Sequence, residues 1–329
     1  MIGLPWLEAA GRQLRDQYRQ QRLPHGLLIV GGSGLGADRL IQWLEGVLLC
    51  QHPDRAPCGQ CHSCNLRLAG NHGDLLHLQP EGKGQQIKVG AVRELVSFSQ
   101  GKAQYGQNQV VLVQQAERLN LAAANALLKV LEEPPAGTYM LLQSADPARL
   151  LPTIRSRLQW FRCPAPPVAE GQSWLEGQGV EQAAAELALA LADHQPCNAL
   201  MLATEDFMSR RQRCLELLRG QIERPSPNLE VLTGLLEQEP AQVLSIWRPW
   251  LADAARLAQA GTSVPLRNTD QADALQSLVG RYPTAALWLR LYDAVEQLRI
   301  QVEADNNLNW QLLLEQFWLS IPREIRRTA

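Results

Sequence analysis

A glycine-rich segment is the first feature of this sequence that could take part in chemistry. Residues 26–30 are apolar, and Gly31 and Gly36 follow with the spacing of the phosphate-binding loop G-x-x-x-x-G-K-[ST]. In such loops the backbone N–H groups hold phosphate oxygens, the lysine reaches the β- and γ-phosphates, and the hydroxyl binds Mg²⁺. Here those two positions hold Ala37 and Asp38. The cation is therefore missing, and a carboxylate occupies a place where a polyphosphate would lie.

The acidic residue of a nucleotide site is also absent. The apolar run 109–113 predicts a strand, and Gln114 and Gln115 follow it where a Walker B strand would end in a Mg²⁺-binding aspartate. Neutral amides are poorer ligands for a hard dication. The two losses together predict a vestigial loop that binds no ATP. Glycine spacing by itself also fits an ordinary turn in an unrelated α/β fold.

Clustered cysteines predict a metal site. Four of them read C-x7-C-x2-C-x2-C: Cys50, Cys58, Cys61 and Cys64. Structural zinc takes four tetrahedral ligands, and a C-x2-C turn presents two sulfurs to one metal. We therefore expect one structural zinc ion at about residues 50–64, with His52 and His62 as nearby substitutes for one sulfur. The scattered cysteines are expected in the core: Cys163, Cys197 and Cys214.

The segment 153–159 contains arginines before a predicted strand at 159–162. An arginine here could be an ordinary solvated surface residue. It could also enter a neighbouring subunit's ATP site as an arginine finger and stabilise charge on the γ-phosphoryl group. Arginine suits that role because it stays charged and binds oxyanions bidentately.

Bulk composition limits the remaining possibilities. The chain has 329 residues, 46% of them hydrophobic, and a formal net charge of -2. This length predicts two or three domains. A zinc-dependent nucleic-acid-binding module is a further hypothesis, although the net charge and the few cations near the cysteines disfavour it. No stretch approaches the ~20 apolar residues of a membrane helix, so we expect a cytoplasmic protein with reduced thiols.

Alternating patterns predict the elements that position these residues. Apolar runs predict strands at 26–30, 109–113, 139–143 and 159–162, and helical spacing predicts helices at 38–49, 87–98 and 120–133. This alternation is typical of a parallel sheet with helices on both faces. Three prolines at 164–167 suggest a linker, and only helices are expected beyond it. The clearest is 285–302, with an apolar stripe of Leu287, Leu291, Val295 and Leu298.

Four motifs in this order resemble the delta-prime family of bacterial DNA polymerase III clamp-loader subunits. They are PHGLLIVGGSGLG at 24–36, the cysteine spacing, AAANALLKVLEEPP at 122–135 and TIRSR at 153–157. The resemblance implies an AAA+ fold. Residues 1–165 would form a RecA-like α/β domain with the zinc module, 166–207 a small helical lid, and 208–329 an all-α collar that oligomerises.

The same resemblance implies a function. Clamp loaders are five-subunit assemblies that use ATP to open a ring-shaped sliding clamp and place it on primed DNA. The delta-prime member is a stator that does not hydrolyse ATP, and the arginine of its S-R-C motif completes the ATP site of an adjacent subunit. By position that arginine is Arg157, and the motif's cysteine is Leu158 here.

The implied partners are the gamma/tau ATPases and delta in a hetero-pentamer, with the clamp and primed DNA reached through the complex and no membrane. The alternative is an ATP-hydrolysing gamma/tau-type subunit, which shares the zinc module. Residues 194–200, where active relatives carry a sensor arginine in the lid, contain none. This third loss favours the non-hydrolysing subunit.

Overall fold

The computed structural model describes residues 2–80, 86–236, 238–304 and 309–327. The chain divides into two compact units, Met1–Glu170 and Gly171–Ala329. The predicted boundary between lid and collar, at 207/208, stays a prediction. None of the helices in the described ranges is long and apolar enough to cross a membrane.

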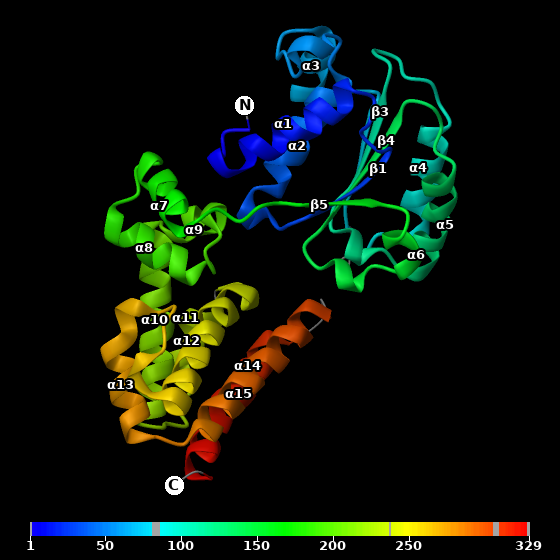
Figure 1. The fold of residues 1–329 in the computed structure, drawn as a ribbon. Coiled ribbons are helices and arrows are strands. Elements are labelled where there is room, and N and C mark those ends of the chain that lie inside the picture. Colours follow the sequence, from blue (N-terminus) through cyan, green and yellow to red (C-terminus); the bar gives the residue numbers. More distant parts are fainter. Residues whose placement is uncertain (1, 81–85, 237, 305–308, 328–329) are drawn as a thin grey trace. The chain divides into compact units, whose positions relative to one another are not determined.

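The first unit is built on five parallel strands in the order β2-β3-β4-β1-β5 (Figure 1). The strands are β1 (Gly26–Val30), β2 (Leu75–Leu78), β3 (Gln109–Val113), β4 (Thr138–Ser144) and β5 (Gln159–Arg162). Four of them were predicted, because the buried central strands are nearly continuous apolar runs. The sequence analysis missed β2, an edge strand of four residues that is only partly buried.

Helices cover both faces of this sheet, as predicted (Figure 1). On one face lie α1 (Pro5–Arg19) and α2 (Ala37–Leu49), and on the other lie α4 (Val89–Ser99), α5 (Leu121–Glu132) and α6 (Pro152–Arg155). Leu28, Val111 and Leu142 pack with the α4 and α5 side chains in one core. The cysteine segment adds α3 (His62–Leu68), and short 3-10 helices occur at η1 (Ser33–Leu35), η2 (Pro53–Arg55), η3 (Ala116–Arg118) and η4 (Pro147–Arg149).

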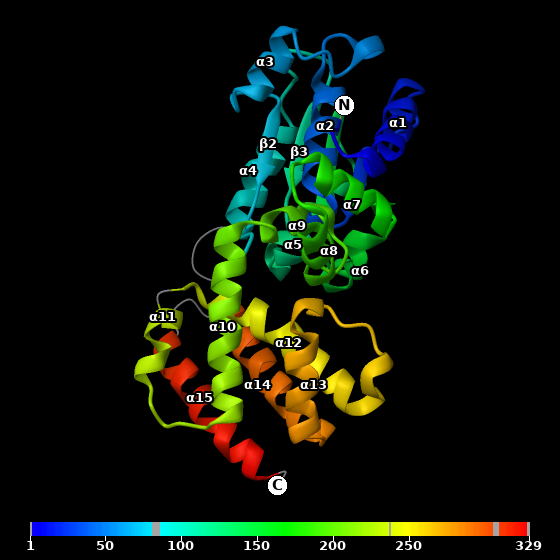
Figure 2. The same ribbon diagram turned by 90° about the vertical axis from the view of Figure 1, so that its left-hand side faces the viewer.

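The second unit contains helices and no strand within its described residues (Figure 2). After α7 (Val168–Gly177), which crosses the boundary, come α8 (Gln182–Leu191), α9 (Pro196–Leu202), α10 (Glu205–Glu223), α11 (Thr233–Leu236), α12 (Pro240–Ala260), α13 (Ala272–Arg281), α14 (Ala285–Ala304) and α15 (Trp310–Arg326). Further 3-10 turns are η5 (Glu230–Leu232), η6 (Gly261–Ser263) and η7 (Thr269–Gln271). The α/β fold followed by helices is therefore confirmed.

The core of this unit is rich in tryptophan. Trp247, Trp250 and Trp288 are fully buried, and the α12 and α14 helices pack along each other. The predicted stripe of α14 is buried at every position: Leu287, Leu291, Val295 and Leu298. The period of 3.6 residues thus identified the face of α14 that enters the core.

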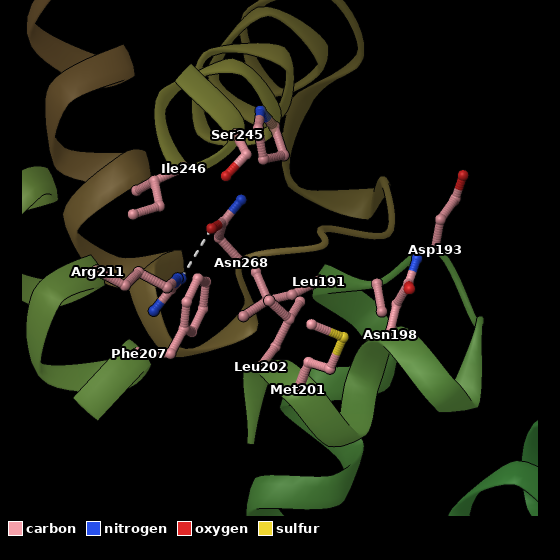
Figure 3. A pocket seen from close by; sticks show the side chains of 12 residues that line it. Leu191, Asp193, Asn198, Met201, Leu202, Phe207, Arg211, Ser245, Ile246 and Asn268 are labelled. Atoms are coloured by element: carbon pink, nitrogen blue, oxygen red, sulfur yellow. Dashed lines mark hydrogen bonds between the residues drawn. The ribbon is translucent and has the colours of Figure 1, made fainter. Parts of the chain in front are cut away.

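A pocket of about 330 Å³ lies between α8 and α9 on one side and α10 and α12 on the other (Figure 3). Its Arg211 is 3% exposed and donates to both carboxylate oxygens of Asp270, at 2.7 and 2.9 Å, and to Oδ1 of Asn268 at 2.8 Å. Burial alone would raise the pKa of Asp270, but the hydrogen bonds from Arg211 and Gln271 hold it below its ordinary value. The arginine is thus paired within the unit and joins α10 to the loop before α13.

Candidate functional site

The predicted phosphate loop lies at the edge of the sheet where the strands end. The Gly31 amide donates to the Ser144 carbonyl at 3.0 Å, next to the end of β4. The Gln143 side chain donates to the Gly31 carbonyl at 3.1 Å and accepts from the Gln115 amide at 3.2 Å. The structure therefore brings the glycine loop and the Gln114–Gln115 turn together, as a nucleotide site requires. Sequence reasoning missed Gln143, which joins them.

Three backbone amides of this loop donate to the loop's own carbonyls. Within the turn that contains η1, the Leu35 amide donates to the Gly32 carbonyl at 3.2 Å and the Gly36 amide to the Ser33 carbonyl at 2.8 Å. The Ala37 amide also reaches the Gly32 carbonyl, at 3.4 Å. In a working loop such N–H groups point at phosphate oxygens. Here these three amides satisfy carbonyls of the loop, so in this conformation they do not point at a bound anion.

The side chains of the loop itself, residues 31–38, are uncharged or acidic. Ala37 is fully buried, and a Cβ placed on Gly31 would lie 2.9 Å from Cβ of Cys163. Burial raises the pKa of Asp38 above its ordinary value. Burial and the nearby Asp38 together raise the pKa of the Cys163 thiol to about 12. This thiol therefore stays neutral, and the loop offers no positive charge to a phosphate.

The four predicted metal ligands converge. Their sulfur atoms all lie within 4.8 Å of one another: Cys50, Cys58, Cys61 and Cys64. A tetrahedral site with metal–sulfur bonds of about 2.3 Å separates its sulfurs by roughly 3.8 Å. The sulfurs of Cys58 and Cys64 are 4.0 Å apart, so the cluster fits one ion of that size. The cysteines come from the end of α2, the following loop and the first turn of α3.

Backbone donors prepare part of this cluster for the thiolate form that a metal requires. The amides of Gln60 and Cys61 donate to the Cys58 sulfur at 3.5 and 3.3 Å, and these bonds lower the pKa of Cys58 to about 6. Burial raises the pKa of Cys64 to about 12. His62 lies edge-on to Tyr105 with ring centroids 5.5 Å apart, and neither predicted substitute histidine belongs to the cluster.

A buried polar network anchors α3 to the sheet. The Asp74 amide donates to Nδ1 of His72 at 3.0 Å, so the proton of His72 is on Nε2 and is directed at Oγ of Ser63, 2.6 Å away. The Ser63 hydroxyl then donates to the Leu49 carbonyl at 2.6 Å. The Asp74 carboxylate accepts from the Gln104 and Tyr105 amides. No local spacing signals these residues, and the sequence analysis did not identify them.

Arg157 is exposed just beyond α6, in the connection to β5. Its Nε donates to a carboxylate oxygen of Glu132 at 2.8 Å, and its Nη1 donates to the Thr153 carbonyl at 2.9 Å. The next residue, Leu158, is 6% exposed and joins the core of the sheet. A Cβ on Gly26 would lie only 3.0 Å from Cδ2 of Leu158, so the glycine of β1 leaves room for this side chain.

Comparisons with known proteins agree with the four motifs. Family models described as "DNA polymerase III, delta subunit" and "DNA polymerase III, delta subunit, C terminal" match residues 6–166 and 180–322. The chain is 38% identical over 323 residues to the DNA polymerase III subunit delta-prime of Yersinia pestis, covering 96% of this chain and 94% of that protein. Identity to the Pseudomonas aeruginosa delta-prime subunit is 36% over 329 residues, with 97% and 98% covered.

A subunit of the tau/gamma type matches a shorter stretch of this chain. The DNA polymerase III subunit tau/gamma of Haemophilus influenzae is 35% identical over 153 residues, which is 46% of this chain and 22% of that protein. The similarity to delta-prime subunits therefore extends through the helical second unit, whereas this similarity to tau/gamma covers less than half of the chain.

Proposed function

Since the chain belongs to the delta-prime family of DNA polymerase III subunits, we propose that it is the non-hydrolysing stator of a bacterial clamp loader. In this role it holds the neighbouring subunits in place while they consume ATP. It supplies Arg157 in trans to the ATP site of one of them.

The observation that carries this proposal is the altered phosphate loop. A stator needs the AAA+ architecture for assembly but no nucleotide of its own. The loop has Ala37 and Asp38 in place of the phosphate-binding lysine and the Mg²⁺-binding hydroxyl, and three of its amides donate to its own carbonyls. A triphosphate here would meet a carboxylate and no cation, so hydrolysis must take place on another subunit.

The exposed guanidinium of Arg157 supports the second half of the proposal. Arginine fingers stabilise the charge that spreads over the transferred phosphoryl group, and one finger contributes about 10³- to 10⁵-fold to the rate. A finger that acts in trans has to be accessible on the surface of its own subunit, as Arg157 is. Its position on a backbone fixed by the buried Leu158 suits this task.

The proposed partners follow from the same family. We place the chain in a hetero-pentamer with gamma/tau ATPases and delta, and it reaches the sliding clamp and primed DNA through that complex. The cysteine cluster would hold one structural zinc ion, because four thiolates fill a tetrahedral shell and leave no open position for catalysis.

The decisive experiment is Arg157→Ala in a reconstituted loader. The ATP site that Arg157 serves should slow by about 10³- to 10⁵-fold, so DNA-stimulated steady-state hydrolysis should lose that site's share and clamp loading should fall. Arg149→Ala, an exposed arginine in η4 on the other side of α6, is the control and should keep the wild-type rate. Unchanged hydrolysis and loading with Arg157→Ala would refute the finger assignment.

A further inference from the structure

The guanidinium of Arg157 is held by a carboxylate from a different element. Its Nε and Nη2 both reach Oε1 of Glu132, at 2.8 and 2.5 Å. Glu132 is the last residue of α5 and lies 25 residues before Arg157 in the sequence. Resting on the proposed function above, we propose that Glu132 is a positioning residue, which holds the finger in the orientation that enters the neighbouring ATP site.

The backbones that carry this pair are fixed by the core. Leu131 precedes Glu132 and is 2% exposed, while Leu158 follows Arg157 and is 6% exposed. Both leucines lie beside Gly26 of β1, since a Cβ placed there would be 3.8 Å from Leu131 and 3.0 Å from Leu158. The two charged side chains thus project from adjacent anchored positions. An ordinary surface ion pair has to hold two long side chains in one geometry, and here the fixed backbones already bring the two side chains together.

The pairing leaves the finger able to work. A guanidinium has five N–H donors in a rigid plane. Within the described residues Arg157 makes four contacts: Nε and Nη2 with Glu132, and Nη1 with the Thr153 carbonyl and, at 3.4 Å, the Ser156 hydroxyl. These four contacts use at most four of the N–H donors. At least one donor therefore remains for a γ-phosphate oxygen while Arg157 stays bonded to Glu132. Because the carboxylate binds one edge of the plane, it sets the direction of the rest.

The test is Glu132→Ala in the reconstituted loader, compared with wild type, Arg157→Ala and the double variant. The readout is the Arg157-dependent turnover of each loader. It is the rate of DNA-stimulated ATP hydrolysis of that loader minus the rate of the Arg157→Ala loader. Misplacing a catalytic group by ~1 Å can cost about 10²-fold. We expect Glu132→Ala to lower this turnover by about tenfold or more through kcat, with the KM for ATP unchanged. Glu132→Gln should restore part of it, because the amide keeps an oxygen acceptor.

The controls separate positioning from a structural role. Glu133→Ala removes the neighbouring exposed carboxylate and should leave turnover unchanged. The melting temperature and complex assembly of Glu132→Ala should match wild type, and the double variant should equal Arg157→Ala. A normal or increased rate with Glu132→Ala, alongside a low rate with Arg157→Ala, would overturn the positioning role alone. No loss with Arg157→Ala would overturn both proposals.

Discussion

At the scale of single residues, the phosphate loop lacks the charges that nucleotide binding would use. Ala37 removes the lysine of the phosphate loop, and Asp38 adds a half-buried carboxylate whose pKa burial raises. The amide of Ala37 itself bonds within the loop. A nucleotide would have to break these bonds and then lie beside an acid, and neither Gln114 nor Gln115 offers Mg²⁺ a charged ligand.

We therefore expect the isolated chain to bind no ATP. Isothermal titration with Mg²⁺–ATP should show no saturable heat, and the melting temperature should not rise with nucleotide concentration, as it would for a ligand of the folded state. An ATP-hydrolysing gamma/tau-type subunit purified in the same way is the positive control. Micromolar affinity with Mg²⁺-dependent turnover would favour the gamma/tau-type alternative for this chain.

At the scale of elements, an ion pair joins α2 to the edge strand β2. Glu45 is 1% exposed and accepts a hydrogen bond from Nε2 of His77 at 2.8 Å. This hydrogen bond raises the pKa of His77 above its ordinary value, although burial opposes the shift. The strand that the sequence analysis missed is thus held to α2 by a charged contact as well as by its pairing with β3.

Because of this pair, the stability of the first unit should depend on pH in a definite direction. Because the folded-state pKa of His77 is raised, the folded chain binds more protons here than the unfolded chain, so stability decreases as pH increases. The contribution is complete below the unfolded histidine pKa of about 6.5 and is lost as pH rises through the raised value. Urea unfolding from pH 5.5 to 9 should show this loss in wild type and not in His77→Gln. A difference between the two that stays constant across this range would contradict the assignment.

At the scale of the whole molecule, the chain contains two units with separate hydrophobic cores. One lies between the sheet and α4, α5 and α6, and the other is centred on the tryptophans of α12 and α14. The cysteine cluster belongs to the first unit only. A metal that binds the folded state stabilises the part of the chain that forms its site.

Loss of the metal should therefore affect one unit. We expect one zinc ion per chain by elemental analysis, and we expect Cys64→Ser or a strong chelator to remove it. The free energy of unfolding of the first unit should then decrease by about 3 kcal/mol or more, while that of the second unit should not change. Cys197→Ser, in the second unit, is the control and should keep the metal. A metal-free wild-type chain, or equal losses in both transitions, would contradict this prediction.

The sequence by itself determined what depends on residue type and short spacing. It predicted four of the five strands, the clustering of four cysteines, the altered phosphate loop and the position of Arg157, because apolar periodicity and motif spacing act over a few residues. Only the tertiary structure decided which distant groups meet. Glu132 on Arg157, Gln143 between two loops and His72 on Ser63 are hydrogen bonds whose partners are set by packing. The pairing of three loop amides with loop carbonyls also depends on backbone geometry, which residue identity alone does not specify.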